Sequence, residues 1–180
     1  MSLEELIIAA MRVATALPVL RWPFYGALIA IAGDQSDLLL MNLLDLGGVG
    51  DYQSFDKYLD QVYLLTFLVV ALRWSGPART ISIGLYLYRL VGFVAFELTG
   101  ERSLLLFFPN LFEYWYLLVA ALHQFRPGLE PLRRPAVFVL PALLVLKLGQ
   151  EYAIHYARLL DGFTTVEALQ AVWRWLASPF

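Results

Sequence analysis

The sequence contains no cysteine, and its only histidines are His123 and His155. Without cysteine the chain cannot form a disulfide, an iron–sulfur cluster or a thiolate zinc site. Two histidines, both near expected helix ends, are too few to indicate a transition-metal site. These absences leave oxygen atoms as the main candidate ligands for any metal ion.

Charge is also scarce. Charged residues make up 16% of the chain, the formal net charge is -2, and no basic stripe of the kind that follows a phosphate backbone is present. Nucleic acid is therefore excluded as an expected partner. The chain has no GxSxG, P-loop, HExxH or GxGxxG signature, so serine hydrolase, nucleoside triphosphatase, zincin and Rossmann functions have no support.

Apolar residues, in contrast, are abundant. They form 60% of the chain, and the mean hydropathy is +0.65. Apolar runs recur at 58–73, 81–98, 104–123 and 136–156, and a longer run at 6–44 is interrupted by Pro18 and Pro23. We therefore predict an all-α, multi-pass integral membrane protein in which residues 1–180 form one domain with about six transmembrane helices.

The predicted helices cover 3–20, 24–45, 54–73, 79–98, 103–124 and 135–160. A short amphipathic helix over 164–177 follows, which either lies at the membrane interface or packs against the bundle. In the predicted helix over 103–124, Glu113 is surrounded by aromatic residues. In the predicted helix over 135–160, one face carries Lys147, Glu151 and His155, which form either a polar site or a structural contact between helices.

One stretch of this apolar chain, residues 33–63, holds an unusual number of acidic groups. Two pairs have spacings that place both carboxylates on one helix face: Asp34 with Asp37, and Asp56 with Asp60. If the two helices bring these pairs together, the four carboxylates suit Mg²⁺, Mn²⁺ or Ca²⁺. Alternatively the acidic residues are solvated charges at helix ends, which is the favoured interpretation for Asp45 and Asp51.

The segments "GDQSD" and "FDKYLD" resemble the signature of the CDP-alcohol phosphatidyltransferases, D-x-x-D-G-x-x-A-R followed by G-x-x-x-D-x-x-x-D. "IIAAMRVATALPVL" is similar to the first helix of that family, which has an arginine in mid-span followed by a proline. The similarity covers roughly residues 1–100. The sequence departs from the signature at Leu38, Met41, Asn42 and Tyr52, which stand at its glycine, alanine, arginine and second glycine positions.

The resemblance implies a role for each matching residue. Asp34, Asp37, Asp56 and Asp60 would hold Mg²⁺ or Mn²⁺, and Asp60 would also be the base that deprotonates the attacking alcohol. Asn42, at the arginine position of the signature, and Arg89, in the fourth predicted helix, would contact substrate. The implied activity is transfer of a phospho-alcohol or phosphatidyl group in phospholipid biosynthesis, with an altered donor or loss of activity as open variants.

The implied partners are membrane lipids, a CDP-linked substrate and a second copy of the chain. Arginines concentrate on one side of the predicted topology, and the positive-inside rule makes that side cytoplasmic. The loop at 45–57 would then face outward, although CDP-linked substrates are cytosolic.

The alternative to the transferase is a non-enzymatic membrane subunit or a cation- or lipid-binding protein. The transferase hypothesis requires the aspartate oxygens to lie close enough to share a cation.

Overall fold

The computed structural model describes residues 2–36, 52–101, 104, 107–126, 136–151 and 174. All regular secondary structure in these residues is helical, which confirms the all-α prediction for the described part of the chain. The helices are α1 (Leu3–Ala16), the short 3₁₀ helix η1 (Leu17–Leu20), α2 (Pro23–Gln35), α4 (Tyr52–Ala71), α5 (Gly76–Thr99), α7 (Leu111–Phe125) and α8 (Ala136–Glu151).

The helix boundaries follow local chemistry. At the start of α1, Ser2 and Glu5 form a capping box, and Pro23 occupies the first turn of α2. The prediction of one continuous helix over 103–124 is wrong, because Leu104 and Phe107 are helical but residues 108–110 are not, and α7 begins at Leu111. The cause is Pro109, which lacks an N–H, and Asn110, whose side chain caps α7 by accepting from the Glu113 N–H.

The C-terminal part of α2's predicted range, residues 37–45, lies outside the described residues. So do the predicted extension of α8 to residue 160 and, apart from Arg174, the amphipathic helix over 164–177. Asp37, Asn42, Asp45, Asp51 and His155 are likewise outside the described residues.

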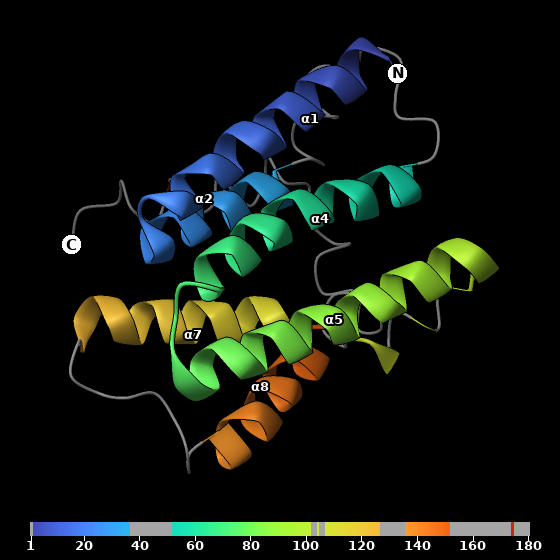
Figure 1. Cartoon of the computed structure of the whole chain (residues 1–180). Coiled ribbons are helices and arrows are strands. Elements are labelled where there is room, and N and C mark those ends of the chain that lie inside the picture. The colour runs from blue at the N-terminus through green and yellow to red at the C-terminus, as the bar shows by residue number, and fades with distance from the viewer. Residues whose placement is uncertain are drawn as a thin grey trace.

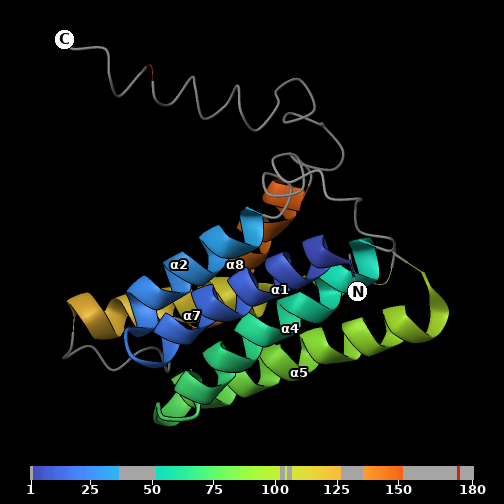
Figure 2. The ribbon, with the colours of Figure 1, turned by 90° about the horizontal axis from the view of Figure 1, so that it is seen from above.

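The helices pack as two adjoining groups (Figures 1 and 2). The helices α1, α2 and α4 pack against one another, while α7 contacts α2, α4 and α5, and α8 packs on α7. Aromatic rings fill the space between α4 and α7, where Phe67 stacks on Tyr116 with ring centroids 4.1 Å apart and Phe112 packs edge-on against both. Tyr63, Phe67, Phe112 and Tyr116 therefore join the two groups into one core.

Among the described residues, only α5 is both long and apolar enough to cross a bilayer, and Phe138–Gly149 within α8 is a shorter apolar helix. The 24 residues of α5 would extend about 36 Å at 1.5 Å per residue, which exceeds the hydrocarbon thickness of a bilayer. The six-span topology stays a prediction.

Candidate functional site

The candidate site is built around Arg12, a buried arginine in the middle of the apolar helix α1. Its guanidinium meets carboxylates from two other helices. Nη2 donates to Oδ1 of Asp56 at 2.7 Å, Nη1 donates to Oδ1 of Asp34, and Nη1 also lies 3.5 Å from Oδ1 of Asp60. Arg12 therefore links α1 to the last turn of α2 and to the first half of α4.

A second cation, Lys57, holds the two aspartates of α4 together. Its Nζ lies 2.5 Å from Oδ2 of Asp56 and 3.2 Å from Oδ2 of Asp60. Asp56 and Asp60 are four residues apart, so their side chains lie on one helix face. Lys57 contacts the Oδ2 atoms of both carboxylates, whereas Arg12 contacts their Oδ1 atoms. Both carboxylates are thus fixed by two cations.

The three aspartates converge as the transferase hypothesis requires. Asp34, Asp56 and Asp60 can each offer one carboxylate oxygen such that these oxygens all lie within 4.8 Å of one another. Asp60 is buried, while Asp34 and Asp56 are half-buried. Asp37, the fourth predicted ligand, lies outside the described residues.

Close packing of α1 on α2 brings Asp34 to Arg12. Gly33 precedes Asp34 and is buried against Thr15 of α1, and a Cβ atom at position 33 would overlap the Thr15 side chain. The Thr15 hydroxyl donates to the Met11 carbonyl at 2.9 Å, which fixes that side chain against α1. The absence of a side chain at Gly33 therefore permits the approach that forms the Arg12–Asp34 pair.

The charges of the cluster nearly balance. Among the described residues, Arg12 and Lys57 form the ion pairs with the three carboxylates, and Arg89 also interacts electrostatically with Asp60. Buried charges require such partners, because removing one partner leaves the others desolvated and unpaired. Three converging carboxylates offer the hard oxygen ligands that a small divalent cation prefers.

Arg89, the substrate-binding residue implied by the resemblance, lies on α5 outside this cluster. It is 7% exposed, its Nη1 donates to the Phe108 carbonyl at 2.9 Å, and its buried Nε has no hydrogen-bond partner. It interacts electrostatically with Lys57 and Asp60 but forms no ion pair with the three aspartates in the described part of the chain.

A second group of polar side chains lies one helical turn beyond Asp60, where α4 meets the start of α7. The Tyr63 hydroxyl donates to Oε2 of Glu113 at 3.0 Å, and Nδ2 of Asn110 donates to the same oxygen at 3.0 Å and to the Tyr63 oxygen at 3.3 Å. This network positions the first turn of α7 within electrostatic range of Asp60.

Arg12 and Lys57 are functional residues of the site that were not predicted from the sequence. The available signal for Arg12 was its position, because an ionisable residue inside an apolar helix needs a partner and marks a polar site. For Lys57 the signal was its place between two aspartates spaced one turn apart. Neither observation predicts which acidic residues the cation contacts, because that depends on how the helices pack.

Comparison of the chain with protein-family models, with curated proteins and with solved structures finds no match.

Proposed function

We propose that this protein is a multi-pass membrane enzyme that uses a divalent cation to transfer a phospho-alcohol or phosphatidyl group, as the CDP-alcohol phosphatidyltransferases do. The observation that carries the proposal is the convergence of Asp34, Asp56 and Asp60 from two helices that are separate in the sequence. The step of four residues from Asp56 to Asp60 matches the family signature, the interval between the two aspartate pairs is one residue longer than in the signature, and the three carboxylate oxygens are close enough to share one ion.

The donor set fits Mg²⁺ or Mn²⁺, since three carboxylates offer the hard oxygen ligands that these ions prefer. Asp34, Asp56 and Asp60 would hold the ion, with Asp37 as a fourth ligand implied by the resemblance. When bound, the ion would neutralise a diphosphate and polarise its phosphorus. Asp60, the most buried of the three, would accept the proton of the attacking alcohol, and Arg12 would keep the carboxylates oriented.

The membrane location is supported by exposed apolar side chains on several helices. Large hydrophobic residues are more than two-fifths exposed on α1, α2, α4, α5 and α8 (Val13, Ile29, Val69, Val91 and Val145 are examples). Such apolar surface on a soluble protein would be unfavourable in water, but it suits contact with lipid. The apolar α5 and the high mean hydropathy agree with this. The homodimer implied by the resemblance stays a prediction.

The test is calorimetric titration of the purified full chain with Mg²⁺ and Mn²⁺, with and without CDP-diacylglycerol. We expect saturable binding that Asp56→Asn and Asp60→Asn abolish, while the exposed Glu101→Gln retains it. A further change in the isotherm on addition of CDP-diacylglycerol would support the transferase reaction. Wild-type protein that binds neither ion would refute the metal site.

A second candidate function is favoured by the central position of Arg12. Because its guanidinium already contacts all three aspartates, the cluster also suits a non-enzymatic membrane subunit in which a permanent ion-pair network fixes α1, α2 and α4. The same titration separates the two functions, since this subunit would show no cation binding and no response to CDP-diacylglycerol.

A further inference from the structure

One end of the bundle brings together three segments that are far apart in the sequence. They are the turn from η1 into α2, the turn from α4 into α5, and the end of α7 (Figures 1 and 2). Nη1 of Arg73, just after α4, donates to the Leu20 carbonyl at 3.1 Å. The ring of Phe125, at the end of α7, packs edge-on against Phe24 of α2 with centroids 5.2 Å apart. Side-chain contacts therefore hold the three segments side by side.

This end of the bundle is rich in arginine and has no acidic residue. The three segments hold four arginines, all exposed: Arg21, Arg73, Arg79 and Arg126. The same segments contain no aspartate or glutamate (17–25, 71–81 and 119–126). None of the four arginines forms an ion pair with another residue that the structure describes. The arginine-rich end therefore presents concentrated positive charge to its surroundings.

Exposed aromatic rings lie among these arginines. Trp22, Tyr25 and Phe125 are each at least half exposed, and the last two pack edge-on against each other. Trp and Tyr are enriched where a protein meets lipid headgroups. Further along α2 from this end, Leu28 and Ile29 expose aliphatic side chains. Cations, then aromatic rings, then aliphatic side chains follow the order of phosphate, glycerol backbone and acyl chain in a phospholipid.

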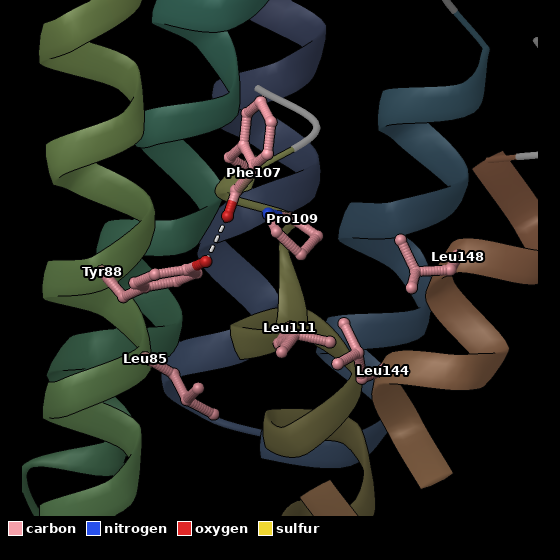
Figure 3. A pocket seen from close by; sticks show the side chains of 7 residues that line it. All are labelled: Leu85, Tyr88, Phe107, Pro109, Leu111, Leu144 and Leu148. Atoms are coloured by element: carbon pink, nitrogen blue, oxygen red, sulfur yellow. Dashed lines mark hydrogen bonds between the residues drawn. The ribbon is translucent and has the colours of Figure 1, made fainter. Parts of the chain in front are cut away.

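The apolar cavity between α5 and α8 lacks such charge (Figure 3). It has a volume of about 410 Å³, and its lining includes Leu85 and Tyr88 of α5 and Leu144 and Leu148 of α8. The Tyr88 hydroxyl donates to the Phe107 carbonyl. Among the described residues that line the cavity none is charged, so it cannot distinguish lipids by the charge of their headgroups.

We propose that the arginine-rich end binds the phosphates of anionic phospholipids in one leaflet of the membrane. Guanidinium groups donate to phosphate oxygens in a planar, two-pronged geometry, and no carboxylate in the three segments competes for them. Arginines near a membrane surface attract anionic lipids, so these lipids gather here in preference to zwitterionic ones. The inference rests on the membrane location in the proposed function, but it requires neither the cation site nor the transfer reaction.

The experiment is electron paramagnetic resonance of spin-labelled phosphatidylglycerol or phosphatidylcholine, with identical acyl chains, in phosphatidylcholine vesicles that contain the full chain. The motionally restricted fraction of the label measures the lipid in contact with the protein. We expect phosphatidylglycerol to associate with the wild type several-fold more strongly than phosphatidylcholine. This preference should fall in about 1 M NaCl, because salt at that concentration screens exposed charges beyond about 3 Å.

Variants locate the preference on the molecule. A chain with Arg21→Gln, Arg73→Gln, Arg79→Gln and Arg126→Gln combined should lose the preference and restrict phosphatidylcholine as the wild type does. The matched control replaces the same four arginines with lysine, which keeps the charge, and should retain most of the preference. Leu148→Trp, which places a larger side chain in the apolar cavity, should leave the preference unchanged.

Equal association of the two lipids with the wild type would overturn the inference, and so would a preference that survives the four glutamine substitutions. A preference lost in Leu148→Trp would also overturn it and assign the lipid to the cavity. A chain that restricts neither lipid would overturn both this inference and the membrane location. A wild type that shows the preference but binds neither Mg²⁺ nor Mn²⁺ would support this inference and refute the metal site alone.

Discussion

Among single residues, Arg12 has the largest effect on the charge and packing of the site. Its guanidinium is buried and touches carboxylates from α2 and α4, so it both neutralises the aspartates and connects three helices. A divalent cation placed among the same oxygens would take over part of this neutralising role. Arg12 and a bound divalent cation would therefore neutralise the same carboxylates.

We predict that Arg12→Leu destabilises the protein by about 3–5 kcal/mol, because it leaves buried carboxylates without their main partner. The measurement is thermal unfolding in detergent, followed by circular dichroism. Mg²⁺ should raise the melting temperature of Arg12→Leu more than that of the wild type, since the ion can replace the lost charge. The control is Arg21→Leu, which removes an exposed arginine from the turn after η1 and should melt as the wild type does. An Arg12→Leu variant with wild-type stability would contradict this role.

At the scale of helices, the site depends on how closely α1 and α2 approach. Thr15 and Gly33 form the contact that lets Asp34 reach Arg12, and the hydroxyl of Ser36, the residue that caps the end of α2, lies 3.7 Å from the Met11 sulfur of α1. The sequence predicted the helices on which the aspartates lie and the face they share, because both follow from local spacing. It could not predict the partner of Arg12, because that depends on the packing of helices.

We predict that Gly33→Val destabilises the protein by about 1–3 kcal/mol, because the added side chain overlaps Thr15 and separates the two helices. The double variant Gly33→Val with Thr15→Ala should recover part of this loss, which a double-mutant cycle of unfolding free energies would quantify. Gly84→Val is a matched control, since a Cβ at Gly84 of α5 meets no other atom within 4 Å. Additive effects of the two substitutions, with no recovery, would show that this contact does not set the helix approach.

The start of α7 is a second place where sequence and structure differ for a physical reason. A continuous apolar run favoured one helix over 103–124, but Pro109 and the capping Asn110 interrupt it. The interruption brings the polar side chains of Asn110 and Glu113 into contact with Tyr63 of α4. Hydropathy alone does not predict this interruption of the helix, because the residues on both sides of it are apolar.

At the scale of the whole molecule, the helix ends fall into two groups. Nη1 of Arg73, after α4, donates to the Leu20 carbonyl at 3.1 Å, so the turn after α1 and the end of α4 lie at the same end of the bundle. Arg21, Arg73 and Arg79 gather at this end, whereas Asp34 lies in the last turn of α2 and Asp56 and Asp60 lie in the first half of α4, away from it. In a membrane, this arginine-rich end would face the cytoplasm.

We predict that single cysteines introduced at Trp22 and Ser75 react from the cytoplasmic side, and that a cysteine at Glu101 reacts from the other side. The natural chain has no cysteine, so labelling with a membrane-impermeant maleimide in intact and in permeabilised cells reports each introduced position without background. Labelling of Ser75→Cys and Glu101→Cys from the same side would mean that α5 does not cross the membrane.

The proposed function requires that the aspartate cluster bind a divalent cation although Arg12 already contacts the same carboxylates. The most direct measurement is electron paramagnetic resonance of Mn²⁺ added to the purified full chain, because the six-line signal of the free ion decreases as it binds. We expect the wild type to remove this signal at one or two ions per chain, Mg²⁺ to restore it by competition, and Asp60→Asn to abolish the effect. An undiminished signal with folded wild-type protein would contradict the claim and leave the cluster as an ion-pair network that holds α1, α2 and α4 together.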